Sequence, residues 1–188
     1  LEDFERRGVR FDFDAPGATH GFRTAPFNQI EVKAATEKQG PNSRGALEVL
    51  LDRLERGQGG RVFWKPFYRR EDFDDERYRP MLTPLADAGQ TVRFKLWLEP
   101  WNGDGNLRVA PYVRRAISGE IIETGAWHVP SSEGWQDYEF TIPEGDEAID
   151  EIGVLVEYFG RLKFLGRLFL AEFSVGGKGK LAIDPKVE

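Results

Sequence analysis

Residues 91–99 alternate strictly between apolar side chains and polar or aromatic ones. Arg93, Lys95 and Trp97 share one side of this run, because successive side chains of a β-strand point to opposite faces of the sheet. A large flat Trp on the polar side of a strand is more than solubility requires. Its ring could stack on the apolar face of a sugar, while the Arg93 guanidinium could donate paired hydrogen bonds to hydroxyl or carboxylate groups.

A second alternating run follows at residues 107–115, after a segment rich in Gly and Asn that is typical of a turn. We predict that the two runs pair as a hairpin, so that Val109 and Val113 face the core together with the apolar residues of the first run. Trp101 lies beside the turn and could line a site at that end. The face predicted to bind a glycan, with some preference for acidic sugars, then comprises Arg93, Trp97, Arg108, Tyr112 and Arg114.

The same polar face has two other interpretations. A loop or a catalytic domain of the same protein could cover it, which would make the chain a docking module without a ligand of its own. Alternatively, an enzyme such as a polysaccharide lyase or hydrolase could be built on the sheet itself. Tyr112 and His128 could then supply a base and the arginines could neutralise a uronate, although no motif supports these roles. The leading hypothesis is a non-catalytic glycan-binding module.

Most other catalytic chemistries are excluded by what the chain lacks. It has no Cys, and its His20 and His128 are too few for a three-His metal site. Neither a G-x-S-x-G segment nor an HExxH zinc motif occurs. The Gly-rich stretch at 176–180 lacks the Lys-Ser/Thr ending of a phosphate loop, so we expect no nucleotide to bind there. Acidic residues of the predicted strands alternate with apolar ones, which is typical of a solvated face.

Three acidic residues could hold a calcium ion, which prefers carboxylate, carbonyl and water oxygens. Asp12 and Asp14 lie in the first predicted strand and Glu172 in the last, so the three meet only if those strands are neighbours. The acidic run at 71–76 is more simply a solvated loop. We therefore expect no required cofactor, and a structural calcium at Asp12, Asp14 and Glu172 is the main candidate for a metal.

Composition and charge narrow the classes of protein. The chain has 188 residues, 40% of them apolar and 13% aromatic, which predicts one globular domain over residues 1–188 with a loose exit at 176–188. Acidic residues outnumber basic ones by 32 to 26, for a net charge of −6, which argues against a nucleic-acid partner. No apolar run of about 18 residues exists, so we expect no membrane span. The sequence starts at Leu1 without a leader, and we expect it to be a piece of a larger protein.

Short alternating runs between 21 Gly and 11 Pro predict an all-β chain. About nine strands favour an antiparallel β-sandwich, most simply a jelly roll. The leucines of Leu47–Arg56 also have helical spacing, but a strand is favoured between the flanking glycines. Besides the two runs above, the predicted strands are 9–13, 46–51, 61–68, 119–128, 135–142, 149–158 and 168–175. Their alternation predicts a core that includes Val92, Phe94, Leu96, Leu98, Tyr138, Phe140, Ile142, Ile152, Val154 and Val156.

Several segments resemble galactose-binding-domain-like modules, a group that includes the carbohydrate-binding modules of glycan-active enzymes. The segments that resemble the second half of such modules are Gly134–Pro143, Ile152–Glu157 and Gly166–Val175, and those that resemble their first strands are Val9–Asp14 and Gly45–Val49. The middle of the chain, residues 73–92, is similar to β-sandwich domains at the end of some bacterial ADP-ribosylglycohydrolase-type proteins.

The resemblance implies a β-sandwich accessory module with a glycan ligand and a catalytic domain elsewhere in the same protein. It also implies a secreted or cell-surface bacterial protein, although the sequence itself does not locate the chain. Many such modules hold calcium between the first strand and an acidic pair in the last strand. Ala171 replaces the first acid of that pair here and leaves only Glu172.

Overall fold

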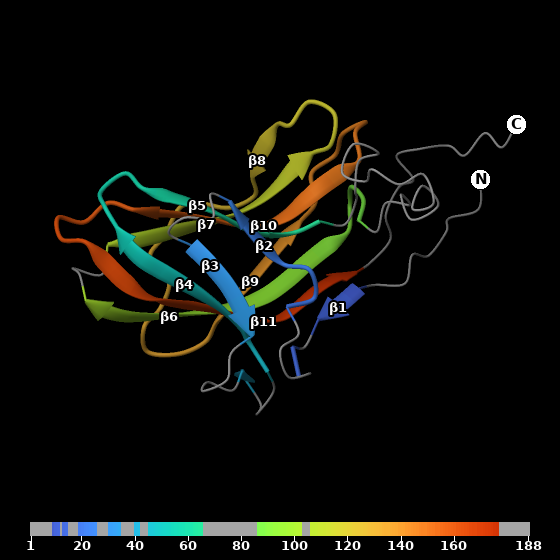
Figure 1. The fold of residues 1–188 in the computed structure, drawn as a ribbon. Coiled ribbons are helices and arrows are strands. Elements are labelled where there is room, and N and C mark those ends of the chain that lie inside the picture. Colours follow the sequence, from blue (N-terminus) through green and yellow to red (C-terminus); the bar gives the residue numbers. More distant parts are fainter. Residues whose placement is uncertain are drawn as a thin grey trace, which may run out of the picture.

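The computed structural model describes residues 9–11, 13–14, 19–25, 30–34, 40–41, 45–65, 86–102 and 106–176. Within these ranges the chain forms eleven strands (Figure 1). In chain order they are β1 (Val9–Phe11), β2 (Arg23–Ala25), β3 (Ile30–Ala34), β4 (Leu47–Leu54), β5 (Gly59–Trp64), β6 (Thr91–Asn102), β7 (Leu107–Arg115), β8 (Ile121–Glu123), β9 (Gln136–Thr141), β10 (Ile149–Tyr158) and β11 (Phe164–Gly176). No helix long and apolar enough to cross a membrane occurs in this part of the chain.

The strands form two antiparallel sheets that lie face to face (Figure 1). The six-stranded sheet has the order β3-β4-β11-β6-β9, and β1 pairs with the last residues of β11. The five-stranded sheet has the order β2-β5-β10-β7-β8 and lies above the other in Figure 1. Most neighbouring strands are distant in sequence, as in a jelly roll. The predicted all-β sandwich is therefore confirmed.

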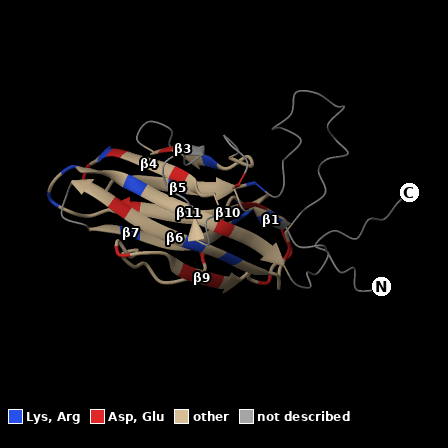
Figure 2. Cartoon of the chain, turned by 90° about the horizontal axis from the view of Figure 1, so that it is seen from below, with Lys and Arg blue, Asp and Glu red and all other residues tan. Residues whose placement is uncertain are grey.

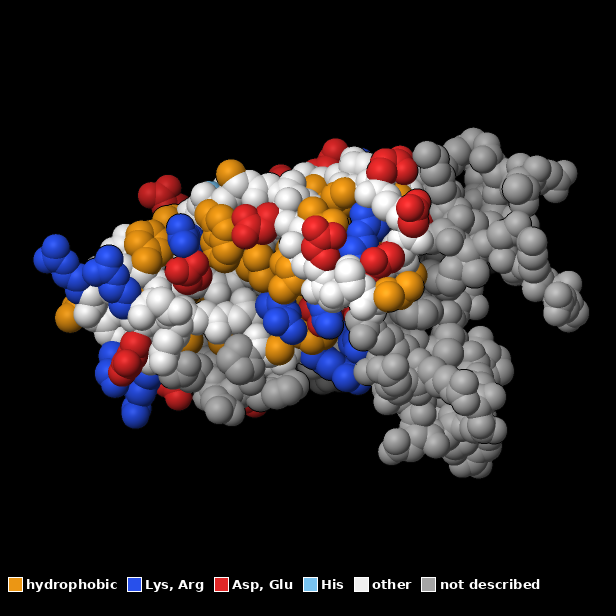
Figure 3. All heavy atoms as spheres, turned by 90° about the horizontal axis from the view of Figure 1, so that it is seen from above, with side chains coloured by type: hydrophobic (Ala, Val, Ile, Leu, Met, Phe, Trp, Pro, Cys, Tyr) orange, Lys and Arg blue, Asp and Glu red, His pale blue; other side chains and the backbone are white. Residues whose placement is uncertain are grey.

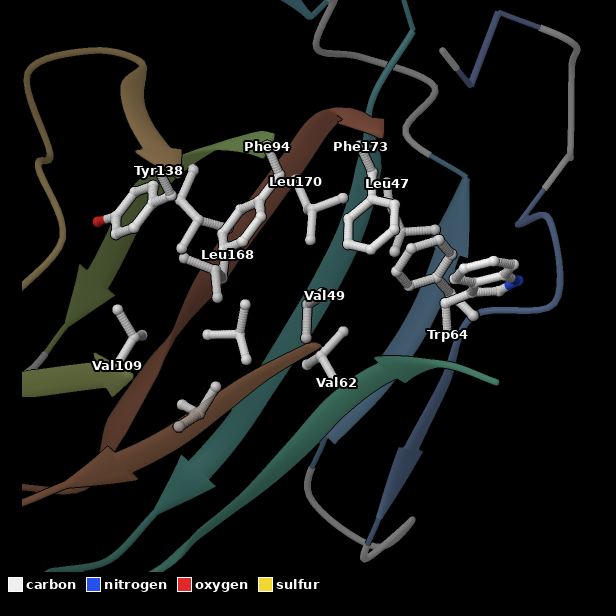
Figure 4. Packing of buried hydrophobic residues seen from close by; sticks show 14 of the residues in the cluster. Leu47, Val49, Val62, Trp64, Phe94, Val109, Tyr138, Leu168, Leu170 and Phe173 are labelled. Atoms are coloured by element: carbon white, nitrogen blue, oxygen red, sulfur yellow. The ribbon is translucent and has the colours of Figure 1, made fainter. Parts of the chain in front are cut away.

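The core lies between the sheets, because each strand turns its apolar side inward. All of the residues predicted for the core from alternation are buried, so that prediction is confirmed. Aromatic rings fill one part of the core (Figure 4). Phe94 stacks on Tyr138 at a centroid distance of 5.2 Å and lies 6.1 Å from Phe173. The Phe173 ring is in turn 6.1 Å from Trp64, so the rings connect β9, β6, β11 and β5 across the sandwich.

The leucine-rich segment forms strand β4, as favoured, and a bulge explains its helical spacing. Leu47, Val49 and Leu51 point into the core with the period of two that a strand requires. The pairing with β11 then shifts, and Arg53 lies in the left-handed region with a φ of 53°. A bulge of this kind takes up one extra residue. Leu54 therefore returns to the core three positions after Leu51.

The predicted hairpin between residues 91–99 and 107–115 is wrong. β6 pairs with β11 and β9, whereas β7 pairs with β10 and β8, so the two strands lie in different sheets. Alternation identifies the apolar side of a strand but not its hydrogen-bonded neighbour. Val109 and Val113 are buried as predicted, but they face the core from the opposite sheet.

Other differences concern short or terminal segments. Alternation does not reveal β2 and β3, which have only three and five residues. β5 begins at Gly59, and the end predicted for it at 66–68 lies outside the described residues, as does the exit beyond residue 176. The strand predicted at 119–128 is reduced to β8 and a bridge between His128 and Val109.

Substituting Leu170 by Ala should lower the free energy of unfolding by about 2–5 kcal/mol, because it removes a fully buried side chain of β11 and leaves a cavity. Ile117→Ala is the control, since this side chain between β7 and β8 is 82% exposed and its loss should cost less than about 0.5 kcal/mol. Urea denaturation followed by tryptophan fluorescence measures both. Equal effects would contradict the assignment of the core.

Candidate ligand-binding face

The outer surface of the six-stranded sheet carries a group of aromatic side chains. We call it the aromatic face and define it by Trp97, Trp101 and Trp135, together with Phe169, which is buried beside Trp97. The outward direction of Trp97 follows from the packing of the core. Leu96 and Leu98 point inward, so the side chain between them must point outward. The register pairs Trp97 on β6 with Phe169 on β11, which places the two rings beside each other.

Trp97 is half-buried and held in one orientation. Its ring packs edge-on against Trp135, with 5.8 Å between the centroids and an interplanar angle of 71°. The Phe169 ring, which is fully buried, lies 6.4 Å from it. The indole Nε1 donates a hydrogen bond of 3.1 Å to the carbonyl of Ser132. These contacts fix the ring before any ligand arrives, which lowers the entropy lost on binding.

Trp101 is the more accessible ring, with 49% of its surface exposed. Its Nε1 donates a hydrogen bond of 3.0 Å to Glu99. The Arg167 guanidinium lies 4.9 Å from the ring centroid and donates a hydrogen bond of 2.6 Å to the same Glu99 carboxylate. Arg167 also pairs with the buried Glu48 at 3.4 Å. A network of charged groups therefore supports the exposed ring from one side.

A hollow of about 370 Å³ lies farther along the same sheet. We call it the charged pocket. It is lined by Arg10 of β1, Arg93, Phe94 and Lys95 of β6, Asp137, Tyr138 and Glu139 of β9, and Glu172 and Ser174 of β11. Figure 2 looks onto this sheet and shows basic and acidic residues side by side on its strands. The charged pocket is a neighbour of the aromatic face, because its lining residues on β6 lie two to four positions before Trp97.

Ion pairs organise the charged pocket. Arg93 donates to Glu139 at 2.6 Å, and Lys95 lies 3.2 Å from Asp137 and 3.6 Å from Glu172. The hydrogen bond to Asp137 raises the pKa of Lys95 above its usual range, so the ammonium group stays charged at neutral pH. The pocket therefore offers donors and acceptors close together, which is what a hydroxyl-rich ligand requires.

Three of the predicted ligand-binding residues lie on the opposite sheet, so the single face predicted from the hairpin is wrong. Arg93, Trp97 and Trp101 are together on the six-stranded sheet. Arg108, Tyr112 and Arg114 belong to β7 of the five-stranded sheet, whose outer surface Figure 3 shows.

Tyr112 is fully buried and cannot stack on a ligand. Its hydroxyl donates a hydrogen bond of 2.7 Å to Glu151, a buried carboxylate on β10. The same carboxylate accepts hydrogen bonds from Arg114 at 2.7 Å and from Arg61 at 3.1 Å. A buried charge is tolerated only when it is paired and hydrogen-bonded. Tyr112 and Arg114 therefore serve the structure of the five-stranded sheet.

Arg108 takes part in a different surface cluster. Its guanidinium lies 4.9 Å from the centroid of the Trp127 ring and 5.6 Å from that of Phe159, and it pairs with Glu157 at 2.7 Å. Figure 3 shows that apolar side chains gather on this surface with basic and acidic ones between them. Arginine on aromatic rings gives a stable cation–π contact without any ligand.

The two side chains considered as a catalytic base are engaged in the fold. Burial and the neighbouring Glu151 carboxylate raise the pKa of Tyr112, which opposes the loss of a proton. His128 is hydrogen-bonded at both ring nitrogens, because Nε2 lies 2.6 Å from the Tyr138 hydroxyl and Nδ1 lies 3.0 Å from the carbonyl of Ala126. Neither arrangement resembles a base that faces a substrate.

Three side chains at the aromatic face are missing from the sequence-based prediction of the ligand-binding residues, although the sequence contains a signal for two of them. Arg167 and Phe169 alternate with Leu168 and Leu170, so they had to face outward if the leucines faced inward. Trp135 precedes β9, and its contact with Trp97 depends on tertiary packing that alternation does not reveal.

The strand pairing that the calcium prediction requires is present, since β1 and β11 are neighbours. The Asp14 carboxylate accepts a hydrogen bond of 2.7 Å from the backbone nitrogen of Gly45, and Glu172 pairs with Lys95. Asp12 lies outside the described residues. Among the described residues no group of three or more His, Asp or Glu is placed to hold a metal ion. The calcium site stays a prediction.

Comparisons with known proteins identify the fold. No family model matches the sequence, and no curated protein matches it. The xylan-binding CBM22-1 domain of Paenibacillus barcinonensis Xyn10C is similar in structure, with a TM-score of 0.55 and 13% identity over 92% of this chain and 94% of that domain. The family 11 carbohydrate-binding module of Clostridium thermocellum, solved with a β-1,3-1,4-mixed-linked tetrasaccharide, has a TM-score of 0.51 and 12% identity over 92% of this chain and 97% of that one.

A third similar structure contains an enzyme. The CBM22-1 and GH10 modules of C. thermocellum xylanase 10B, solved with xylohexaose, match with a TM-score of 0.56 and 9% identity over 94% of this chain but only 29% of that one. These likenesses establish that the chain has the β-sandwich fold of carbohydrate-binding modules, as the resemblance in the sequence predicted.

Tyr112→Phe tests the structural role of the buried hydroxyl. The change leaves Glu151 with one donor fewer in a buried site, so the free energy of unfolding should fall by about 1–3 kcal/mol. Chemical denaturation at neutral pH measures the difference. A variant as stable as the parent would contradict the assignment of Tyr112 to the buried network.

Proposed function

We propose that the chain is a non-catalytic module that binds a glycan through the aromatic face of the six-stranded sheet. The observation that carries this proposal is the exposed Trp101 ring, supported by the ion-paired Arg167 and aligned on β6 with the fixed Trp97 ring. Flat aromatic rings held in place are suited to stacking on the apolar faces of sugar rings.

The spacing of the two rings supports a polysaccharide chain as the ligand. Trp97 and Trp101 are four residues apart on one strand, which separates them by about 13 Å along β6. That distance exceeds one sugar ring, so a ligand that contacts both must contain several units. The similar structures solved with xylohexaose and with a mixed-linked tetrasaccharide make β-linked glucans and xylans the first ligands to test.

Two finer features of the proposal concern the ligand's charge and the larger protein. Arg93 lies next to the aromatic face and supports an acidic sugar as one component of the ligand. A catalytic domain in the same protein would use the module to stay near its polysaccharide, and the xylanase structure joins a similar module to its catalytic module.

Trp101→Ala should weaken binding to xylohexaose or a mixed-linked glucan at least about tenfold, equivalent to about 1.4 kcal/mol, because it removes the exposed stacking surface. Trp97→Ala should have a similar effect. Trp127→Ala is the matched control. It removes a Trp side chain that packs on Arg108 of the opposite sheet, and it should change the affinity less than about twofold.

Isothermal titration calorimetry measures the affinities, after a glycan array has selected the ligand. Thermal unfolding of each variant separates a lost contact from a lost fold. An array without any bound glycan would contradict the proposal and favour a docking module. Loss of binding in Trp127→Ala with retention in Trp101→Ala would move the site to the five-stranded sheet.

A further inference from the structure

We propose that the charged pocket is a subsite for the carboxylate of an acidic sugar unit, held between Arg10 and Arg93 over Ser174. The inference rests on the glycan-binding function proposed above and specifies its ligand as a polysaccharide that carries uronic acid. A uronate at one end of the bound segment would occupy the charged pocket while neutral units lie on the aromatic face.

The strand register places the two guanidinium groups on either side of a small residue. Arg10 on β1 is the partner of Ser174 on β11, and Ser174 is the partner of Arg93 on β6. Partners in adjacent strands share a face, so two long basic side chains flank one hydroxyl group, with their Cα atoms about 10 Å apart. All three residues line the hollow of about 370 Å³. That volume is within the range of small-ligand sites, which begins at about 300 Å³.

The distribution of charge leaves Arg10 available for an anion. Glu139 pairs with Arg93, and Lys95 pairs with both Asp137 and Glu172. No ion pair or hydrogen bond joins the exposed Arg10 side chain to another residue that the structure describes. A planar carboxylate can accept two parallel hydrogen bonds from one guanidinium group. Its geometry therefore fits an arginine side chain.

The pocket's own carboxylates do not block this role. The Asp137 and Glu139 side chains are 84% and 61% exposed, so water screens them from an incoming anion. The more buried Glu172 has Lys95 at 3.6 Å. Arg93 uses its Nε to contact Glu139, which leaves the outer nitrogens of the fork for a second acceptor.

The test compares two ligands that differ only in charge. Calorimetry is carried out with a glucuronic-acid-bearing xylo-oligosaccharide and with the same compound after its carboxyl group has been reduced to an alcohol. The parent chain should bind the acidic form at least about tenfold more tightly, as expected for charged guanidinium–carboxylate contacts. Arg10→Ala should lose most of this preference, because only Arg93, which also pairs with Glu139, then remains to bind the carboxylate. The affinity of this variant for the reduced form should be unchanged.

Two further variants make the result specific. Lys163→Ala removes a basic side chain outside the pocket, where it pairs with Glu55, and should keep the preference for the acidic form. Ser174→Leu fills the hollow and should abolish the preference by a route that leaves both arginines in place.

The outcomes separate this inference from the function on which it rests. Equal affinity of the parent for both forms would overturn the carboxylate subsite while leaving glycan binding intact. Loss of the preference in Lys163→Ala as well as in Arg10→Ala would overturn it too, because a general effect of net charge would then explain the result. Absence of binding to either form would refute the proposed function and this inference together.

Discussion

The structure depends on the register of β11, the strand at the centre of the six-stranded sheet. It pairs with β4 and β1 on one side and with β6 on the other. That register sets Phe169 beside Trp97 and Arg167 beside Trp101, and it aligns Ser174 with the two arginines of the charged pocket. A shift by one residue would turn each of these side chains into the core.

A bulge within β11 changes which of its residues point toward the core. Its pairing with β6 shifts between Ala171 and Ser174, and Glu172 lies in the left-handed region with a φ of 53°. Phe173 therefore points inward to the ring cluster while Ser174 points outward. Backbone in this region is costly for a residue other than Gly or Asn, and dense packing around Phe173 compensates for it.

Sequence alone predicts the faces of the strands better than their neighbours. Period-two alternation correctly identifies Phe94 and Val109 as core residues, since burial acts on each strand separately. It fails for Tyr112, because the polar side of a strand can be occupied by an internal network as well as by solvent. The contact between Trp101 and Arg167 is not predicted either, because the two residues are distant in sequence and meet only in the folded sheet. Which strands become hydrogen-bonded neighbours depends on the whole chain and has no local signature in the sequence.

The acidic residues of β9 have a further consequence for how copies of the chain behave toward each other. β9 lies at the end of the six-stranded sheet in the described part of the chain. Backbone groups on such an edge can recruit a strand from another molecule, and charged side chains oppose this. Asp137 and Glu139 stand on that edge. The same carboxylates that line the charged pocket thus oppose edge-to-edge association, so a substitution at either position changes the charge of the pocket and of the sheet edge together.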